Sequence, residues 1–526
     1  MKKALVFGGG LTGLVAARTL ARHGFEVRIV DSSGLAGGKS GADAHDGRMW
    51  EYSYHIFPAW YRNLRAILEE LEIKLIDLDR WHYVEKPGAS WRWITSRVPD
   101  SLVSLYRSLR DGLLLILDAI IYWYFVLDML AQPLSRKHIL YQVSWLGMMR
   151  GRWYMTPHIP EMEKENVLKA SAIPVYELSA MRAKKISAYW VTAPLPFLSI
   201  LPRDLQTAFI DKIVGWTQDA GAELLLGEHV ARVEAGGARI KRVRTENVDT
   251  GAQTEHEADL FLFTTPLEVT RRLLRWELQK VEPALGEIEH LEAAPMAALT
   301  LMLNQRRTDL PKEHVFFRQG RYGLSFIDVA PHWPNQTTSA LTFISSNVIP
   351  LRHLTEAEHY DALMGEIHEY LAISKTDVTD KKLNANTDVP LFINTIGAWA
   401  PRPRIKAHTI KNLYFAGEWV RNPIDLACMR PRQHGGCGLR GGQRREGDGR
   451  AGGNERNPCA RNTADTPALA PAVAEVGAHA GDGSRPRVVS PRSAVKQVKT
   501  LGQRGHQRSR VGRAEQPRVA PDPQIV

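Results

Sequence analysis

Three glycines near the start of the chain, Gly8, Gly10 and Gly13, have the spacing Gly-x-Gly-x-x-Gly. In a turn between a strand and a helix, the first glycine permits the tight turn, the second lets the backbone approach a diphosphate, and the third lets helix and strand pack closely. The amino end of such a helix directs unpaired N–H groups and a partial positive charge at the phosphates. Asp31 is placed to accept hydrogen bonds from a ribose. The pattern therefore predicts a site for a dinucleotide.

The residues around the glycines predict the elements that hold them. We expect a strand over 4–7, a helix that reaches Arg22 and stops at Gly24, and a second strand over 26–30 that ends at Asp31. The alternative is a secretory signal, because Met-Lys-Lys precedes an apolar run with small residues. The strand, helix and strand explain more of the residues, so we favour the nucleotide site. An acid at the end of the second strand favours an unphosphorylated ribose, as in FAD or NAD.

Four later segments, together with this start, resemble a known family. A second glycine pair and a basic residue follow at 37–39, and "EYSYHIFPAWYRNL" spans 51–64. "GAELLLGEHVARVEA" predicts two strands, and "NLYFAGEW" predicts a closing strand. In this order the motifs resemble the superfamily of FAD-dependent amine oxidases and carotenoid desaturases, and the 51–64 segment is similar to a motif of phytoene and zeta-carotene desaturases. The resemblance covers about residues 1–429 and is loose over 85–200.

The resemblance implies FAD as the cofactor and a set of residues that contact it. These are Gly8, Gly10, Leu11, Gly13, Asp31, Gly38, Lys39, His55, Ile56, Val230, Gly417 and Glu418. Within this set, Val230 would contact the adenine through its backbone, His55 would lie near the flavin, and Gly417 with Glu418 would meet the ribityl chain and diphosphate. We assign no catalytic residue, because the flavin itself carries the chemistry, and we expect His55 to be a positioning residue rather than a general base. No histidine spacing indicates a metal site.

The predicted fold is α/β, with a Rossmann-like FAD-binding domain and a second, α+β substrate domain that contains an antiparallel sheet. The FAD-binding domain would be discontinuous, over 1–80, 200–270 and 390–429, and the substrate domain would comprise 81–199 and 271–389. Apolar and alternating runs predict the strands and the helix of the substrate domain. The strands are expected over 297–304, 314–329 and 339–347, and the helix over 356–373.

For function, the resemblance implies an FAD-dependent oxidoreductase. The 51–64 motif and the apolar middle of the chain favour desaturation of a carotenoid or a related apolar isoprenoid, with hydride transfer to flavin N5 and return of the electrons to a quinone or oxygen. Alternatives are a flavin amine oxidase, a protoporphyrinogen-type oxidase and a hydroxysqualene-dehydroxylase-like enzyme. A further alternative is a non-catalytic relative impaired by its altered C-terminal segment.

The most lipophilic part of the chain is the segment 102–135. Asp118 and Asp128 interrupt it, and its apolar stretches are too short to cross a bilayer. Two interpretations stay open, namely core helices of the substrate domain or a surface that docks on a membrane. The second would place four basic residues against anionic headgroups: Arg107, Arg110, Arg136 and Lys137. We accordingly expect a cytoplasmic protein, with peripheral contact to the inner face of the membrane under the second interpretation.

Charge and aromatic content both change at residue 430. Residues 430–526 hold 18 Lys and Arg against 8 Asp and Glu and contain no Phe, Trp or Tyr. The preceding 429 residues are almost neutral, so the net charge of +11 indicates no specific nucleic-acid partner. Such a composition predicts a disordered tail. All three cysteines lie at or after Cys428, which leaves none for a disulfide or a metal site in the rest of the chain.

The resemblance also stops at this boundary. In the family, the closing strand leads into an alanine-rich helix whose amino end faces the flavin, but the sequence departs from that pattern after Met429. A GC-rich back-translation of 429–443, read one base later, yields an alanine-rich segment of the family's form. We therefore predict that the residues after about 429 are translated out of the ancestral frame, with weaker retention of FAD as a consequence. The alternative is a genuine basic tail that binds anionic lipid or nucleic acid.

Overall fold

The computed structural model describes residues 1–45, 47–78, 80–86, 92–97, 115–132, 137–194, 196–275, 277–334 and 336–422. The predictions for the tail and for the junction near Met429 lie outside these residues and stay predictions. The same holds for Arg107, Arg110 and Arg136, and for the side chain of Lys137.

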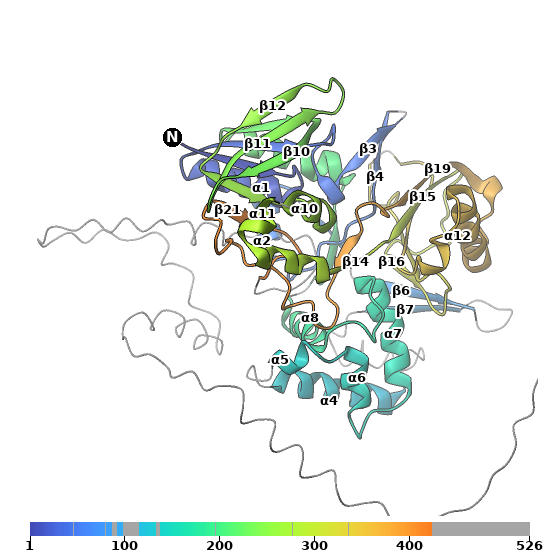
Figure 1. Ribbon diagram of the computed structural model, residues 1–526. Coiled ribbons are helices and arrows are strands. Elements are labelled where there is room, and N and C mark those ends of the chain that lie inside the picture. The colour runs from blue at the N-terminus through green and yellow to red at the C-terminus, as the bar shows by residue number, and fades with distance from the viewer. Residues whose placement is uncertain are drawn as a thin grey trace, which may run out of the picture. The chain divides into compact units, whose positions relative to one another are not determined.

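A parallel five-stranded sheet has the order β21-β13-β1-β2-β9 (Figure 1). From one edge to the other, the strands are β21 (Leu413–Phe415), β13 (Leu260–Phe263), β1 (Lys2–Phe7), β2 (Phe25–Asp31) and β9 (Ala222–Leu226). Val6 lies opposite Ile29 on one neighbouring strand and Leu262 on the other. The strands of this sheet read as apolar runs because both of its faces are covered. The predicted Rossmann-like domain is confirmed.

The two faces of this sheet bear different layers. Val6 and its neighbours on one face pack against three helices, α1 (Leu11–Arg22), α2 (Arg62–Glu70) and α9 (Asp211–Gln218), the last preceded by a π-helical turn over Gln206–Ile210. Phe7 points to the opposite face, because side chains alternate along a strand. That face is covered by α10 (Leu267–Leu274), α11 (Glu277–Val281), the 3-10 segment Pro283–His290 and an antiparallel sheet of β10 (Glu228–Ala235), β11 (Ile240–Asn247) and β12 (Gln253–His256).

A second, mainly antiparallel sheet of seven strands has the order β19-β15-β18-β17-β16-β6-β7. Its strands are β19 (Val378–Ala385), β15 (Ala297–Leu303), β18 (Ala340–Ser345), β17 (Leu324–Asp328), β16 (His314–Phe317), β6 (Arg80–Glu85) and β7 (Arg92–Arg97). One face packs against α12 (Glu356–Leu371), whose amino end is closed by a capping box of Thr355 and Glu358. This confirms the antiparallel sheet, although the expected strand over 314–329 is two strands joined by a turn.

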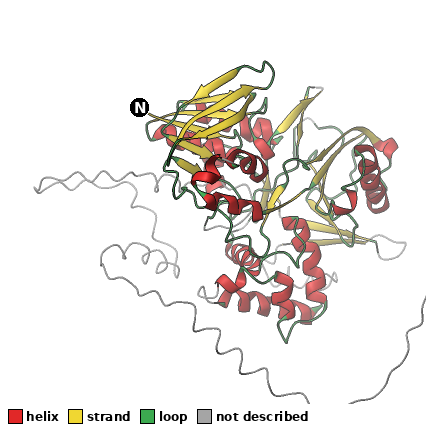
Figure 2. Ribbon diagram, in the orientation of Figure 1, coloured by secondary structure: helices red, strands yellow, loops and turns green. Residues whose placement is uncertain are grey.

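A helical region lies below the two sheets in the view of Figure 2. It comprises α4 (Ile116–Ala131), α5 (Lys137–Leu140), α6 (Trp145–Arg150), α7 (His158–Ser171) and α8 (Ala180–Thr192). Phe125 and Met129 of α4 pack against Trp145 and its neighbours, so this helix does contribute to a core. Among the described residues, no helix combines the length and the apolar character needed to cross a bilayer.

Short pairs of strands connect these layers. β14 (Glu292–Ala294) pairs with β20 (Leu391–Ile393), and β5 (Ile76–Leu78) pairs with β8 (Leu198–Ile200). β3 (Ala42–His45) and β4 (Arg48–Glu51) form a hairpin. The expected boundaries of the two domains stay a prediction. The segment 267–291 packs on the parallel sheet, and β6 and β7 complete the antiparallel one.

Candidate cofactor and substrate site

The three glycines of the first motif form the turn between β1 and α1. Gly8 has a φ of +103°, a left-handed conformation that side chains rarely adopt. A Cβ atom on Gly13 would lie 1.9 Å from the carbonyl oxygen of Gly8. The helix therefore reaches this close to the strand only because residue 13 is glycine.

The amino end of α1 is open toward the edge of the sheet. Within the described chain no side chain caps this helix, and its first turn contains no carboxylate. The first N–H groups of a helix have no partner within the helix, so this end suits an anion. Leu11 is buried in the core, and its contact with a cofactor would therefore come from its backbone rather than its side chain.

The second glycine pair supports the first turn. Gly37 donates its backbone N–H to the carbonyl oxygen of Gly9 at 3.0 Å. Gly38 has a φ of +56°, and a Cβ atom there would approach the Cα of Gly10 to 3.1 Å. The two motifs thus form one glycine-lined surface on which a diphosphate could lie close to the backbone.

Asp31 and Val230 flank the same end of the parallel sheet. The Asp31 carboxylate accepts the backbone N–H groups of Gly9 at 2.5 Å and Ser33 at 2.8 Å, and each of its oxygens retains a lone pair for a ribose. Gly227 donates to the carbonyl oxygen of Ser33 at 3.1 Å, which holds the start of β10 beside the end of β2. Val230 lies near that start, partly buried against the core of the sheet.

The loop after β21 closes the site from the other side. Gly417 has a φ of +145°, and the preceding residue, Ala416, donates its N–H to the carbonyl oxygen of Phe263 at 2.9 Å. The Lys39 ammonium lies 2.9 Å from a carboxylate oxygen of Glu418, and both side chains are half-buried. This ion pair joins the second glycine motif to the closing loop.

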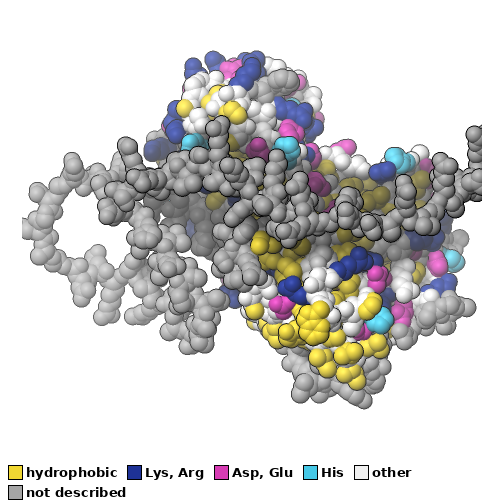
Figure 3. Space-filling model, turned by 60° about the horizontal axis from the view of Figure 1, so that its bottom comes forward, with side chains coloured by type: hydrophobic (Ala, Val, Ile, Leu, Met, Phe, Trp, Pro, Cys, Tyr) yellow, Lys and Arg dark blue, Asp and Glu magenta, His cyan; other side chains and the backbone are white. Residues whose placement is uncertain are grey.

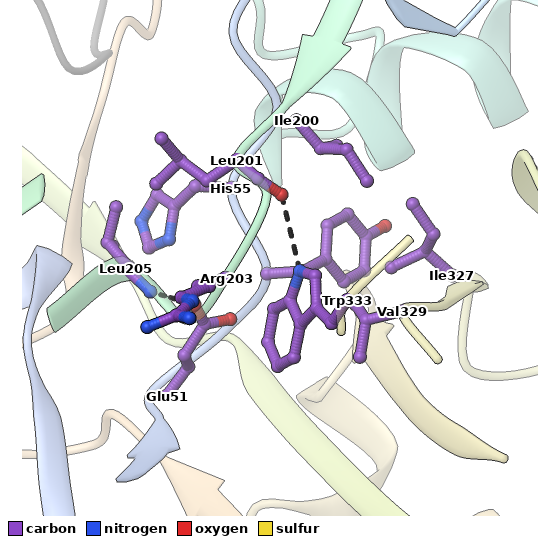
Figure 4. Close-up of a pocket in the computed structure, with 10 residues that line it drawn as sticks. Glu51, His55, Ile200, Leu201, Arg203, Leu205, Ile327, Val329 and Trp333 are labelled. Atoms are coloured by element: carbon purple, nitrogen blue, oxygen red, sulfur yellow. Dashed lines mark hydrogen bonds between the residues drawn. The ribbon is translucent and has the colours of Figure 1, made fainter. Parts of the chain in front are cut away.

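A pocket of mostly apolar character begins where the 51–64 motif meets the seven-stranded sheet (Figure 4). Its lining residues are Glu51, Tyr54, His55, Ile200, Leu201, Arg203, Leu205, Ile327, Val329 and Trp333. In Figure 4, Glu51, His55 and Arg203 lie at one end, and Ile327 and Val329 lie at the other. Ile56, the neighbour of His55, packs with the apolar cluster behind this lining.

Burial keeps two ionisable groups of the pocket uncharged at neutral pH. Burial raises the pKa of Glu51 to about 8, despite the hydrogen bond that its carboxylate accepts from the Leu205 N–H. Burial lowers the pKa of His55 to about 4, which a backbone hydrogen bond with Ser53 only partly offsets. The Nδ1 atom of His55 is inaccessible to water and has no hydrogen-bond partner among the described residues. It could receive a partner from a bound cofactor.

A cluster of aromatic side chains packs behind the pocket lining. Trp190 lies 4.3 Å from Phe197 and 5.8 Å from Trp81 between ring centroids, and Trp60 lies 4.9 Å from Phe197. Phe197 belongs to the same apolar cluster as Tyr54 and Ile200 of the pocket lining. Rings of this size provide a large apolar contact area for a flat or extended ligand.

The residues present fit the adenosine diphosphate part of FAD. Glycines stand where the two glycine motifs pack against each other and against the strand, α1 is uncapped, and Asp31 has free acceptor positions. Ten of the predicted cofactor residues lie at one edge of the parallel sheet, whereas His55 and Ile56 lie at the pocket, and contact of all twelve with FAD stays a prediction. No cluster that could hold a metal ion occurs in the part of the chain that the structure describes.

Sequence reasoning missed several residues of this site. Glu51 and Tyr54 lie inside the quoted 51–64 motif, but nothing in the motif showed that they face a pocket. Arg203 and Trp333 come from segments with no recognised motif. Arg402 is 2% exposed and binds the backbone of the closing loop. The only sequence feature that could have pointed to Arg402 is its position beside proline, shortly before the last described strand.

Comparisons with known proteins agree with this geometry. Residues 6–71 match the model of an NAD(P)-binding Rossmann-like domain, and residues 191–423 match that of a flavin containing amine oxidoreductase. The chain is similar to 15-cis-phytoene desaturase of Synechococcus elongatus, with 23% identity over 60% of this chain and 68% of that protein.

Two solved structures share the fold. One is an oxidoreductase from Methanosarcina mazei, with a TM-score of 0.60 and 14% identity over 80% of this chain and 95% of that one. The other is a double mutant of putrescine oxidase, with a TM-score of 0.59 and 14% identity over 79% of this chain and 93% of that one.

Proposed function

Since the chain belongs to the superfamily of FAD-dependent amine oxidases and carotenoid desaturases, and is an FAD-dependent oxidoreductase, we propose that it desaturates a carotenoid or a related apolar isoprenoid. Electrons would leave the enzyme to a quinone or to oxygen. The similarity to phytoene desaturase supports this choice, although its 23% identity leaves the substrate to be tested.

The observation that carries the proposal is the character of the pocket lining. Five of its side chains are aliphatic and two are aromatic, and burial keeps Glu51 and His55 neutral at pH 7. Such a lining favours an uncharged substrate, because a charged group loses its hydration there without gaining a matched partner. Arg203 contributes the one guanidinium group of the lining.

In the reaction, bound FAD would accept a hydride from the substrate. The residues of the chain hold the substrate in place and exclude water from the reacting carbon. The aromatic rings of the lining, Tyr54 and Trp333, would orient an extended chain through their contact area. Glu51, with a pKa of about 8, would take up the proton that leaves the neighbouring carbon only above that pH, where its carboxylate is ionised.

The test is anaerobic bleaching of the flavin absorbance of the purified protein. We expect bleaching by apolar isoprenoids and none by amines or porphyrinogens. Bleaching by amines alone would establish the amine oxidase alternative that the 191–423 match favours.

A pair of variants makes this test specific for the pocket. Ile200→Asp places a charge in the lining and should slow bleaching by the isoprenoid by about tenfold or more. Ile349→Asp introduces the same charge at a side chain that is 60% exposed, and it should leave the rate unchanged. Equal rates for both variants would contradict an apolar substrate in this pocket.

We propose further that α4 docks the enzyme on a lipid bilayer, where an apolar substrate resides. One face of this helix exposes six large apolar side chains, Ile116, Leu117, Ile120, Trp123, Tyr124 and Leu127. Asp118 and Asp128 point inward instead, where Asp118 accepts a hydrogen bond from Thr156 and Asp128 binds Arg152 and Tyr154. Apolar side chains gather over the helical region in Figure 3. An outward apolar face with Trp and Tyr is typical of a helix that lies in a membrane interface.

Sedimentation with vesicles of neutral and anionic phospholipids tests the docking. The variant Ile120→Gln/Leu127→Gln should lose most of its binding, because two apolar side chains no longer enter the lipid. The matched control Val248→Gln/Leu354→Gln changes two apolar side chains that are exposed elsewhere. If both variants bind vesicles as the unmodified protein does, α4 is not the docking surface.

A further inference from the structure

A buried arginine holds the loop that follows β21. Arg402 donates to the backbone carbonyl oxygens of Glu418 and Val420, both at 2.7 Å, and to that of Trp419 at 3.2 Å. It also donates to the side-chain oxygen of Asn394 at 3.2 Å. Three successive carbonyl groups of the closing loop are thus turned toward a single guanidinium group.

This arrangement fixes the direction of the amide N–H groups. The C=O and N–H bonds of a trans peptide point in opposite directions, so the N–H groups of residues 419, 420 and 421 point away from Arg402. Those of Val420 and Arg421 donate to Gly417 and Pro403. The N–H groups of Gly417, Glu418 and Trp419 have no acceptor among the described residues. Successive free N–H groups of this kind form a binding site for an anion.

The loop lies at the same edge of the sheet as the glycine turn. The indole N–H of Trp419 donates to the carbonyl oxygen of Thr265 at 3.0 Å, directly after β13. The neighbouring Thr264 donates its hydroxyl to the carbonyl oxygens of Phe7 and Gly8, at 2.7 and 3.0 Å. The free N–H groups after β21 and the open end of α1 after β1 therefore lie on either side of β13, at the same edge of the sheet.

From these contacts we propose that Arg402 is a positioning residue for the cofactor. By holding the carbonyl groups of residues 418–420, it orients the free N–H group of Trp419 and fixes the loop on which the free N–H groups of Gly417 and Glu418 also lie, so that the loop faces the diphosphate of FAD. Arg402 does not touch the cofactor. The inference rests on FAD as the cofactor and is independent of the substrate.

The chemistry of the side chain explains why arginine stands here. A guanidinium group has five N–H donors in one plane, whereas a lysine ammonium is a single point with three. The Phe392 and Trp399 rings lie 5.1 and 5.4 Å from the guanidinium carbon and stabilise the buried charge. Lysine at this position could keep the charge but could not hold three carbonyl groups in their present directions.

The test compares Arg402→Lys with Arg271→Lys in the full-length protein. Arg271, which lies on α10 and away from the closing loop, is a matched control. Its guanidinium group also binds the backbone carbonyl oxygens of three residues, Ile288, Glu289 and Leu291. Both variants should lower the unfolding temperature of the apoprotein by similar amounts. Only Arg402→Lys should raise the dissociation constant of FAD, by about tenfold. Equal FAD affinity of the two variants overturns the proposal.

Two further measurements locate the effect at the diphosphate. ADP should lose affinity for Arg402→Lys by the same factor as FAD, whereas AMP should lose less than about twofold. Equal losses for ADP and AMP overturn the assignment to the diphosphate. The second measurement uses the unmodified protein and therefore does not depend on whether a variant folds. ADP should slow hydrogen exchange of the amides of residues 417–419, and AMP should not. Unchanged exchange at these amides would also overturn it.

Discussion

The parallel sheet and the helical region place their apolar residues in opposite ways. In the sheet, every residue of β13 is buried, and the candidate cofactor site lies at the edge where the strands end. In α4, large apolar side chains face outward, and Asp118 and Asp128 face inward to polar partners. The first region functions through backbone geometry, which glycine spacing reveals. The helical region would act through the apolar face that α4 exposes, and amino-acid composition does not reveal which face of a helix is exposed.

The substitution with the largest expected effect disrupts the backbone geometry of the parallel sheet and its glycine turn. In Gly13→Ala, the added Cβ would meet the Gly8 carbonyl oxygen, so we expect loss of FAD binding and a decrease of about 3 kcal/mol in the free energy of unfolding. Gly215→Ala in α9 is the control, because no atom lies within 4 Å of the added Cβ. It should raise the stability by up to about 1 kcal/mol. Denaturation and flavin titration measure both, and normal FAD affinity of Gly13→Ala would contradict the role of this glycine.

A substitution with a smaller expected effect tests whether α4 directs its large apolar side chains outward and its carboxylates inward. Asp128→Leu removes the partner of Arg152 and Tyr154, so the free energy of unfolding should fall by about 2 kcal/mol. Ile120→Gln changes an exposed side chain of the same helix, and the free energy of unfolding should stay within about 0.5 kcal/mol. Chemical denaturation of the two variants provides the measurement. A larger loss from Ile120→Gln would show that this face is covered rather than exposed.

The smallest expected effect is a dependence of stability on pH, which comes from His55 of the pocket. The pKa of His55 is about 4 in the folded protein against 6.5 ordinarily, so the unfolded chain binds more protons between these values. The stability that neutral His55 provides is present above pH 6.5 and is lost as the pH falls to 4. Allowing for partial exposure, we expect a loss of about 1 kcal/mol, absent in His55→Asn.

Asp128 should respond only at lower pH. Burial opposes its ionisation, but hydrogen bonds from Tyr154 and Arg152 outweigh that effect and hold its pKa below the ordinary 3.8. Its contribution is therefore lost only below that pH. Urea unfolding of the apoprotein at pH 7, 5 and 4 distinguishes the two groups, and an identical pH dependence of His55→Asn and the unmodified protein would contradict the assignment to His55.

The sequence allowed prediction of the fold wherever a local signal specifies the backbone. Gly8, Gly10 and Gly13 predicted the turn, and the strands and the helix around them were confirmed within two residues. The antiparallel sheet followed from alternating apolar residues. Its strand order could not be predicted, because β6 pairs with β16 across a long separation in sequence.

The pocket was not predicted for a related reason. Glu51, Arg203 and Trp333 meet only after three separate segments pack together, and none of them carries a spacing that indicates a pocket. Arg402 acts on carbonyl groups, which every residue has, so no pattern of residue types marks its target. In α4, the period of apolar residues is the same whether that face is buried or exposed.

The position of β21 in the sheet has a consequence for biosynthesis. This strand is the last that the structure describes, yet it pairs with β13, the direct neighbour of β1. The ribosome therefore releases the glycine turn long before the closing loop exists. Until residues 413–420 emerge, β13 has an unpaired edge that must be kept from pairing elsewhere. Stable capture of the cofactor is accordingly one of the last steps in the maturation of the described chain.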